Sequence, residues 1–507
     1  MNFLRFYKNI PLIERIFLVS GLILFVITAI NSLGYYHMDE HYQLVEFAYY
    51  KVGKGPEWAL PWEYFDKIRP TGQVAVLVLL FNLFDIIGLN DPYIVMAIVR
   101  VMSGVLLFCA IYVFRKRTEV VLIGPFSKRI YLFLSYFLWF IPFIAVRYSS
   151  ETWSALFLLL GTGLALKDRN SRAFYWKVGI LFGLSFIMRF QTAFYIAPFL
   201  LWFVFKSGEF IKSAFFVFIG LSIVVFVGIV LDSWFYGDEW IITPYRYFVS
   251  FKNSSSPTSF AAEPWYFFFK SILYYPGVIV GGAILFFSVF GILSRPKDPI
   301  IWATISFIFF HSLVGHKEER FLFPIVFMLP YIMSLGIDFI LNLSKEKVRR
   351  VLKVGIFLLL VPVNLFGSSL ISITPAGSGK MNFTQYVRRH YGNNPIRVFA
   401  PLYGNPYSMW GEFTAYYREN DMENLRIENF IIEDSLYRDD AVNFFMIRKM
   451  NLYTPECKKL IADKKMKLLF SSHSDFIRKI NTRFRKEYER ENDEVFMLYL
   501  WEKDSLK

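Results

Sequence analysis

The feature that most constrains this chain is a series of apolar runs, each close to the length that crosses a lipid bilayer. Crossing a hydrocarbon core of ~30 Å takes about 20 helical residues. Such runs recur until about residue 370 of a 507-residue chain, of which 55% is hydrophobic and 20% aromatic. Because backbone polar groups inside a bilayer must be satisfied within the segment, the runs predict transmembrane α-helices. A soluble globular fold is excluded.

We predict eleven transmembrane helices and one further apolar run, 73–89, that is interfacial or re-entrant. Counting 73–89 as a full crossing would place the basic loop 115–117 on the side opposite the basic amino terminus. Without it, all the short basic loops share the cytoplasmic side, as the positive-inside rule requires. The predicted spans are 16–34, 92–114, 130–146, 152–166, 174–188, 192–205, 214–232, 271–293, 300–315, 321–341 and 351–370, and the basic loops are 115–117, 167–172, 206–212, 295–297 and 345–350.

The formal net charge of +14 does not indicate a nucleic-acid partner. Lys and Arg are concentrated in the loops between spans, where anionic headgroups and the orienting effect of positive charge account for them. We therefore expect membrane lipids as partners and no nucleic acid. Cys109 and Cys457 have neither metal-ligand spacing nor an evident disulfide partner. The first apolar run has no convincing cleavage site and is interpreted as a retained helix.

The same count of crossings places the polar segments that could carry chemistry on the outer face of the membrane. From about residue 371 the spans cease, and strand-like segments alternate with polar helical stretches. We predict a transmembrane catalytic domain over 1–370 and a small extracytoplasmic α/β domain over 371–507, joined by a linker at 375–379. The outer segments are 35–72, 147–151, 189–191, 232–270 and 316–320, with 35–72 and 233–270 as the main outer loops, and the strand-like segments are 396–399, 468–470 and 495–498.

The first outer segment holds three carboxylates beside a span, those of Asp39, Glu40 and Glu46. Charges close to hydrocarbon carry a desolvation cost, so their presence favours a chemical role. In a helix, Asp39, Gln43 and Glu46 share one face, and Glu40 is rotated by about 100°. Such a carboxylate can accept the proton of an attacking hydroxyl, with Asp39 as first candidate and Glu40 as second. A solvated acidic loop is the structural alternative.

The segment 316–320 concentrates positive charge just before Pro324 and a predicted span. Lys317 and Arg320 are three positions apart, and His316 and Arg320 four, so a helix would place them on one cationic face. A helix entrance adds free backbone donors and a positive dipole end, which suits a phosphate group. The alternative is an interfacial anchor of snorkelling cations, with Glu318 and Glu319 as counterions.

Taken in order, these motifs resemble glycosyltransferase family 22, the polyprenyl- or dolichyl-phosphate-mannose-dependent α-mannosyltransferases of the GT-C fold class. The resemblance covers about residues 35–325 and looks closest to the branch acting on glycosylphosphatidylinositol anchors and lipid-linked oligosaccharides. Segments 147–151 and 189–192 look like degenerate forms of two further family segments. The segments that carry the resemblance are Asp39-Glu40-His41-Tyr42-Gln43 with Glu46, Trp62-Glu63, Ile68-Arg69, Asp232-Ser233-Trp234, Pro264-Trp265-Tyr266 and His316-Lys317-Glu318-Glu319-Arg320.

The resemblance implies a polytopic GT-C membrane enzyme that transfers mannose, with inversion, from a lipid-phosphate donor to a glycolipid or lipid-linked glycan. Asp39 or Glu40 would be the catalytic base, and the leaving phosphate would be bound by the cations of 316–320. No nucleotide-sugar Asp-x-Asp motif or metal-ligand spacing is evident, so no essential metal or other cofactor is expected. Implied donor-phosphate residues are His316, Lys317 and Arg320, and implied substrate-binding residues are Gln43, Glu46, Trp62, Glu63, Arg69, Asp232, Trp234 and Trp265.

Two other classes of protein fit parts of this pattern. A GT-C transferase of another lipid-linked sugar would keep an outer acidic loop. Competition between lipid-linked sugar donors would distinguish that enzyme from a mannosyltransferase. A lipid or glycan transporter would carry ionisable residues deep within its spans, but 152–166 and 214–231 contain none. We expect a multi-pass protein of a bacterial inner membrane, or of the endoplasmic reticulum if the source is eukaryotic, with its site on the extracytoplasmic or lumenal side.

Overall fold

A computed structural model gives the structure of the protein as two compact units. The helical unit comprises Met1–Ala29, Asp66–Ala75 and Val99–Ser372, and the mixed unit comprises Ile30–Phe65, Val76–Ile98 and Ile373–Lys507. Parts of the predicted loops 167–172 and 233–270 lie outside the described residues. The structure describes all residues except 1–10, 168–170, 238–239, 254–261, 393, 402–404, 410–411, 419–424, 429–436, 449–451, 453, 475, 478, 480–494 and 503–507.

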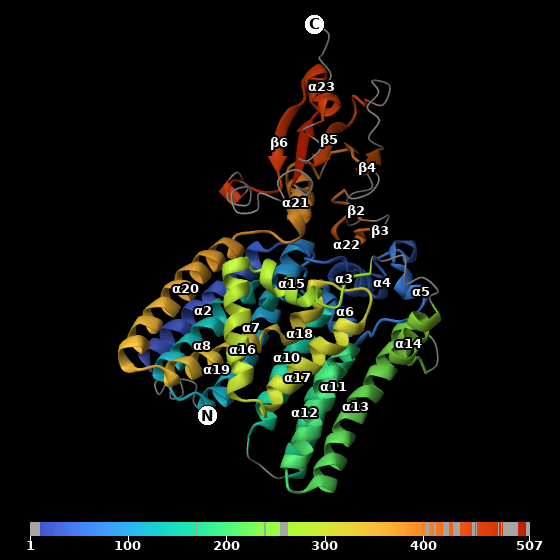
Figure 1. The fold of residues 1–507 in the computed structure, drawn as a ribbon. Coiled ribbons are helices and arrows are strands. Elements are labelled where there is room, and N and C mark those ends of the chain that lie inside the picture. Colours follow the sequence, from blue (N-terminus) through green and yellow to red (C-terminus); the bar gives the residue numbers. More distant parts are fainter. Residues whose placement is uncertain are drawn as a thin grey trace. The chain divides into compact units, whose positions relative to one another are not determined.

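The helical unit is built from the helices that the apolar runs form (Figure 1). Every run predicted as a span is helical over most of its length, and three runs are broken into two helices each: α8 with α9, α15 with α16, and α18 with α19. The helices are α2 (Leu12–Asn31), α7 (Pro92–Thr118), α8 (Pro125–Phe137), α9 (Ile141–Ala145), α10 (Ser150–Ala165), α11 (Arg172–Met188), α12 (Ala193–Lys206), α13 (Phe210–Tyr236), α14 (Thr243–Asn253), α15 (Phe267–Tyr274), α16 (Val278–Ser294), α17 (Pro299–Leu313), α18 (Phe323–Val326), α19 (Leu329–Leu343) and α20 (Glu346–Ser372), with 3₁₀ turns at Glu119–Val121, Phe190–Thr192 and Glu319–Leu322.

Four helical stretches among the described residues are long and apolar enough to cross a membrane unaided: Leu12–Asn31, Pro92–Val121, Phe210–Tyr236 and Glu346–Tyr391. The pair Glu319–Val326 and Leu329–Leu343 also passes this test when taken together, but it is bent by 68°. Shorter apolar helices occupy Gly72–Ile86, Phe190–Lys206, Val278–Ser294 and Pro299–Leu313. The chain is therefore a polytopic helical membrane protein, and eleven crossings stay a prediction.

Helices of the helical unit pack closely where glycines face a neighbouring backbone. α11 and α13 lie side by side along much of their length (Figure 1), and a Cβ on Gly179 would overlap the carbonyl oxygen of Val217. α16 and α19 meet in the same way, because a Cβ on Gly336 would overlap the carbonyl oxygen of Phe287. Small residues allow such close approach in membranes, where van der Waals packing drives helix association.

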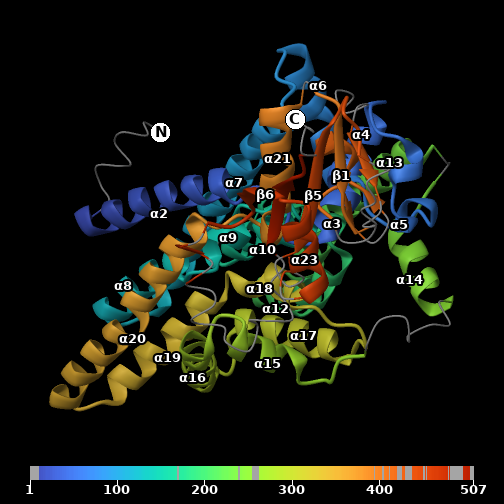
Figure 2. The ribbon, with the colours of Figure 1, turned by 90° about the horizontal axis from the view of Figure 1, so that it is seen from above.

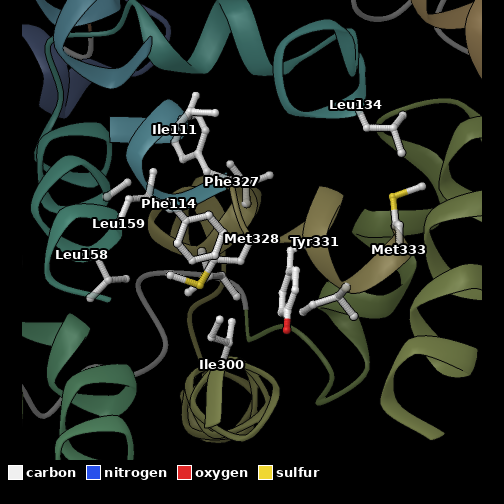
Figure 3. Packing of buried hydrophobic residues seen from close by; sticks show 14 of the residues in the cluster. Ile111, Phe114, Leu134, Leu158, Leu159, Ile300, Phe327, Met328, Tyr331 and Met333 are labelled. Atoms are coloured by element: carbon white, nitrogen blue, oxygen red, sulfur yellow. The ribbon is translucent and has the colours of Figure 1, made fainter. Parts of the chain in front are cut away.

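The core of the helical unit is apolar and draws on helices far apart in the sequence. Figure 2 shows α8, α20, α19 and α16 beside one another, and each of these helices contacts α19 or α20. Figure 3 shows part of the core, where Phe114 of α7, Ile300 of α17 and Tyr331 of α19 lie together. This contiguous packing gives the unit a rigid frame for the polar side chains at the ends of its helices.

The mixed unit contains a five-stranded sheet with the strand order β4-β1-β5-β7-β6. β1 is parallel to β4 and β5, whereas β7 is antiparallel to β5 and β6. Of the three segments that the sequence favours as strands, 396–399 and 468–470 lie in β1 and β6, and 495–498 overlaps β7. The strands are β1 (Ile396–Phe399), β2 (Ser408–Met409), β3 (Glu412–Phe413), β4 (Leu425–Glu428), β5 (Val442–Arg448), β6 (Lys467–Ser471) and β7 (Phe496–Leu500), with β2 and β3 forming a separate pair.

Both faces of the central strands are buried, which explains their mostly apolar sequences. On one face, Phe383 of α21 (Lys380–Tyr391) packs with Val398 and Phe444. On the other, Cys457 of α23 (Pro455–Asp463) packs with Phe445. Successive strand residues point to opposite faces, so a strand covered by helices on both sides needs no polar alternation.

The mixed unit also includes residues from the first hundred positions of the chain. They form α3 (Met38–His41), a π-helix at Tyr42–Glu46, α4 (Phe47–Lys51), α5 (Trp62–Phe65) and most of α6 (Gly72–Ile86). Contacts to α22 (Ala415–Arg418) join them to the carboxy-terminal part of the unit. The predicted division into 1–370 and 371–507 stays a prediction.

Candidate active site

Two adjacent carboxylates, those of Asp39 and Glu40, occupy different environments in the first turn of α3. His37 caps this turn, since its Nδ1 accepts from the backbone N–H of Asp39 at 3.3 Å. The Asp39 side chain is 23% exposed and lies 3.6 Å from the same nitrogen. Glu40 is buried and accepts from the backbone N–H of Tyr36 at 2.9 Å. Asp39 is therefore the carboxylate of this pair that a substrate can reach more easily.

The predicted α-helix through this segment is interrupted by a π-helix at Tyr42–Glu46. In a π-helix the residues that face each other are five positions apart, and His41 Nε2 accordingly lies 2.7 Å from Glu46 Oε1. The extra residue in the turn changes the phase of the helix. The shared face predicted for Asp39, Gln43 and Glu46 from α-helical spacing is therefore wrong.

The pair formed by His41 and Glu46 is completely enclosed within the mixed unit. The imidazole ring of His41 is stacked between Tyr35, at 4.8 Å, and Tyr417, at 5.3 Å. The Glu46 carboxylate also accepts from the backbone N–H of Tyr416, at 3.1 and 3.2 Å. Glu46 thus fixes α22 against the π-helix, which is a structural contribution independent of any contact with substrate.

Gln43 and Glu63 form a second buried pair in the mixed unit. Gln43 Nε2 donates to Glu63 Oε1 at 2.9 Å, and so links the π-helix to α5. Trp62 precedes Glu63 on α5, but its side chain is exposed. Of the substrate-binding residues predicted here, Trp62 presents the accessible apolar surface, while Gln43 and Glu63 hold the surrounding backbone.

In the helical unit, Asp232 near the end of α13 accepts three hydrogen bonds. Its donors are the backbone N–H and hydroxyl of Thr71, at 2.7 and 2.8 Å, and the hydroxyl of Thr243, at 2.6 Å. These contacts indicate a bracing role for Asp232. Tyr236 donates to the backbone carbonyl of Arg69 at 2.9 Å and adds to the same brace. Trp234 and Trp265 are both exposed.

The cations of 316–320 do not form one open face, because each has a partner of its own. His316 Nε2 lies 2.8 Å from Glu318 Oε1, and Arg320 pairs with Glu318 and Glu151. Lys317 Nζ donates to the backbone carbonyl of Glu263 at 2.7 Å. The predicted arrangement of all three on a helical face is wrong, since the 3₁₀ turn begins only at Glu319.

Arg320 belongs to a group of charges that we call the guanidinium cluster: the buried Glu151, Arg189 and Arg320, and the half-buried Glu318. Glu151 Oε1 accepts from Arg189 Nη1 at 2.7 Å and from Arg320 Nη1 at 3.0 Å. The ring of Phe321 lies 5.3 Å from one guanidinium and 5.5 Å from the other. A single carboxylate oxygen thus holds two guanidinium groups side by side.

The positive charges of Arg69 and Arg320 also act on Arg189. Burial lowers the pKa of Arg189, and the neighbouring charges of Arg320 and Arg69 act in the same direction, against Glu151. Burial also lowers the pKa of Lys317, and the Glu263 carboxylate opposes this shift. An anion that entered here would relieve the repulsion among these cations. Guanidinium groups pair well with phosphate, so the cluster can hold a phosphate ester.

Glu151 and Arg189 were not among the site residues predicted from the sequence, although both belong to segments noted for their resemblance to the family. Each lies at the end of an apolar run, where an ionisable residue needs a partner. The opposite charges of these two residues were the sequence signal that could have indicated their pairing. Among the described residues, no group of His, Cys, Asp and Glu side chains has the arrangement of a metal site.

The sequence profile of the Alg9-like mannosyltransferase family matches residues 16–410. The chain is 26% identical over 345 residues to GPI mannosyltransferase 3 of Trypanosoma brucei brucei, covering 57% of this chain and 59% of the relative. It is 26% identical over 327 residues to mannosyltransferase APTG1 of Arabidopsis thaliana, covering 62% and 56%. The chain thus spans less than two thirds of the length of these two relatives.

A shorter match, 34% identical over 152 residues, links the chain to alpha-1,2-mannosyltransferase ALG9 of Saccharomyces cerevisiae, over 29% of this chain and 26% of the relative. Among solved structures, ArnT from Cupriavidus metallidurans bound to undecaprenyl phosphate is similar with a TM-score of 0.49 and 11% identity, over 96% of this chain and 97% of that one. The family profile extends over most of the chain and confirms the resemblance to glycosyltransferase family 22. The chain belongs to the Alg9-like mannosyltransferase family.

Proposed function

We propose that this protein transfers mannose from polyprenyl- or dolichyl-phosphate mannose to a glycolipid or lipid-linked glycan, forming an α-mannoside. The observation that carries the proposal is the family profile over residues 16–410. The relatives named above as mannosyltransferases support it, as does a buried group of cations suited to a lipid phosphate.

The donor phosphate would be bound by the positive charge of the helical unit. Arg320 and Arg189 offer paired guanidinium donors, and Lys317 adds an ammonium group whose charge is poorly solvated. As the bond from the anomeric carbon to the phosphate oxygen breaks, negative charge accumulates on the leaving phosphate. Fixed cations in a desolvated environment stabilise that charge more strongly than water does. His316 would add a hydrogen bond from its imidazole ring.

The acceptor hydroxyl would lose its proton to Asp39 while its oxygen bonds to the anomeric carbon. Attack opposite the leaving phosphate converts the β-linked donor into an α-mannoside. The greater exposure of Asp39 supports its place ahead of Glu40, whose carboxylate is buried. The exposed Trp62, Trp234 and Trp265 would present aromatic surfaces to sugar faces, with Gln43, Glu46, Glu63, Arg69 and Asp232 shaping the surrounding backbone.

The proposed location is a membrane that the chain crosses several times, with the reaction on the extracytoplasmic or lumenal face. This membrane would be the bacterial inner membrane or, in a eukaryote, that of the endoplasmic reticulum. The basic loops between helices support the orientation, because positive loops are retained in the cytoplasm.

The test is transfer of labelled mannose from polyprenyl-phosphate mannose into membrane glycolipid, in cells that otherwise lack the activity. Asp39→Asn should abolish transfer at an unchanged protein level, because an amide cannot accept the hydroxyl proton. Asp85→Asn is the matched control, since Asp85 pairs with Lys54 at an exposed position. Normal transfer by Asp39→Asn would refute the base assignment. If the intact protein used a different lipid-linked sugar and not mannose, the proposed donor would be wrong.

A further inference from the structure

At one end of the helical unit, the ends of several helices surround a cavity of about 550 Å³. α7, α12 and α16 end at this cavity, and α17 begins there. Its volume falls within the range of about 300–1,000 Å³ typical of small-molecule sites. None of its lining residues belongs to the guanidinium cluster or to the other residues assigned to the proposed transfer reaction.

The cavity is lined by four cations, Arg117, Lys206, Arg295 and Lys297, and all four side chains are exposed. Among the described lining residues, Asp298 provides the one carboxylate. Among the described lining residues, the cations therefore outnumber the carboxylates by four to one.

The carboxylate of Asp298 already accepts hydrogen bonds from two groups of the protein. Asp298 caps α17 by accepting from the backbone N–H of Ile300 at 2.9 Å, and it also accepts from the hydroxyl of Tyr331 at 2.6 Å. Figure 3 places Ile300 and Tyr331 next to each other at the edge of the core. With both of its oxygens accepting hydrogen bonds, the Asp298 carboxylate is held in place and shapes the wall of the cavity.

Neighbouring positions on α7 show how this chain neutralises cations that have only a structural role. Arg115 and Lys116 pair with Glu14 and Glu119. Arg117 follows them directly and lines the cavity instead. Arg295 is held in place, because its Nη2 donates to the backbone carbonyl of Val121 at 3.1 Å. A fixed guanidinium is better suited to binding than a mobile one, because less side-chain entropy is lost.

The surroundings of the cavity match the polar boundary of a membrane. Trp202 lies within α12, and its ring is 5.1 Å from Lys206 Nζ at the end of the same helix. Tryptophan and snorkelling lysine concentrate where hydrocarbon meets headgroups. The cations come from three of the basic loops that the sequence assigns to the cytoplasmic face, where anionic phospholipids attract positive charge.

We propose that this cavity binds the phosphate group of an anionic phospholipid from the surrounding leaflet. The four cations would hold the phosphate ester, and Trp202 would lie alongside the glycerol and upper acyl chain. Zwitterionic lipids carry a cationic group beside the phosphate, which the cavity would repel. The site is separate from the donor site in the proposed function, so failure of one proposal leaves the other standing.

The test measures lipid binding to the purified full chain in detergent by native mass spectrometry, with phosphatidylglycerol and phosphatidylcholine titrated separately. The cavity variant carries Arg117→Gln, Lys206→Gln, Arg295→Gln and Lys297→Gln. The control carries Lys128→Gln, Arg129→Gln, Lys345→Gln and Lys347→Gln, which removes the same charge from exposed positions outside the cavity.

We expect the cavity variant to bind phosphatidylglycerol at least about tenfold more weakly than the intact protein, and the control to stay within about twofold. Phosphatidylcholine binding should change little in either. Equal loss in the cavity variant and the control would overturn the proposal. The double variant Lys206→Gln with Lys297→Gln keeps Arg295 and its backbone contact, and it should weaken phosphatidylglycerol binding to an intermediate degree if the full variant fails to fold.

A further titration with inorganic phosphate separates the two sources of a phosphate group. If phosphate at millimolar concentration leaves the bound phosphatidylglycerol in place, the lipid assignment is supported. If inorganic phosphate displaces the lipid completely and its own binding is lost in the cavity variant, the ligand is a soluble phosphate and the lipid assignment is wrong.

Discussion

Glu151 is the residue on which the charge balance of the guanidinium cluster depends. Its carboxylate is buried and binds both Arg189 and Arg320. Removing one member of a buried ion pair leaves an uncompensated charge, at a cost of about 3–5 kcal/mol. We therefore expect Glu151→Gln to lower the free energy of unfolding by about this amount, measured by thermal unfolding in detergent.

The matched control for Glu151 is Glu346→Gln. Glu346 pairs with Arg350 through one turn of α20, but both side chains are more than three quarters exposed. Exposed pairs of this kind contribute little, because water and salt screen the charges. Equal destabilisation by Glu151→Gln and Glu346→Gln would contradict the structural importance assigned to the cluster.

Lys317 gives the proposed donor site a dependence on pH. Burial lowers the pKa of its ammonium group, so the positive charge is lost at a lower pH than in an exposed lysine. As pH rises toward that lowered pKa, the donor phosphate loses a cationic partner, and the KM for polyprenyl-phosphate mannose should increase. In Lys317→Arg the charge persists and the increase should disappear, because a guanidinium stays protonated.

The measurement for Lys317 is the donor KM in transfer assays from neutral pH up to about pH 10, close to the ordinary pKa of a lysine. Lys270→Arg, at an exposed position of α15, should leave the profile of the intact protein unchanged. A Lys317→Arg protein with the same alkaline rise in KM would show that another group titrates.

The sequence indicates some of the charged residues of the candidate site, but it does not indicate which partners they contact. Asp39 and Arg320 stand in charged segments beside apolar runs, and this is visible in the sequence. The pairing of Glu151 with Arg189 and Arg320 joins three segments that are 38 and 169 positions apart, and it depends on how the helices pack. Spacing rules describe neighbours on one helix and carry no information about such distant partners.

At the scale of elements, the helices follow from hydrophobicity, whereas their breaks do not. Every run predicted as a span is helical, because the backbone of an apolar segment has no other way to satisfy its hydrogen bonds in lipid. The break between α15 and α16 falls at Gly277, which has φ 85°, a conformation that glycine adopts readily. The π-helix at Tyr42–Glu46 has no comparable local signal, and contacts such as that between His41 and Glu46 stabilise it.

The close packing of α16 against α19 makes a prediction at this scale. Gly336→Ala would place a Cβ onto the carbonyl oxygen of Phe287, so the two helices would have to separate. Overpacking of this kind costs about 1–3 kcal/mol. Thermal unfolding in detergent should show this loss for Gly336→Ala.

Gly355 in α20 is the control for this effect, since a Cβ there meets no atom within 4 Å. Gly355→Ala should leave stability unchanged or raise it by up to about 1 kcal/mol, because alanine favours the helix. If Gly336→Ala were as stable as Gly355→Ala, the approach of α16 and α19 would be looser than the structure indicates.

At the scale of the whole molecule, the sequence predicts the class of protein, and the structure adds how distant segments combine into units. Composition and the length of the apolar runs are sufficient to predict a polytopic membrane protein. The mixed unit collects residues 30–65 and 76–98 together with 373–507, and residues 99–372 separate the first two ranges from the last along the sequence. The contact of Glu46 with the backbone of Tyr416 is one of those that join them, and a pair 370 positions apart has no local sequence signal.

The bent pair α18 and α19 leaves one question about the path of the chain through the membrane, and labelling can answer it. α19 alone has 15 residues, so its length of roughly 22 Å is less than the ~30 Å hydrocarbon core. Together with α18 and the preceding 3₁₀ turn, α19 is long and apolar enough to cross a membrane as one broken span, despite the bend of 68°. The basic loop 345–350 supports a full crossing, because it would then face the cytoplasm with the other basic loops.

Cysteines introduced at Lys270 and Lys345 in a protein lacking Cys109 and Cys457 test this path. Three crossings separate the two positions if α18 and α19 form a span, and two if they form a re-entrant loop. We expect a membrane-impermeant maleimide to label only one of the two positions in sealed membranes, and the other only after permeabilisation. Labelling of both from the same side would show that α18 and α19 re-enter the membrane, and the basic loop 345–350 would then be an exception to the positive-inside rule.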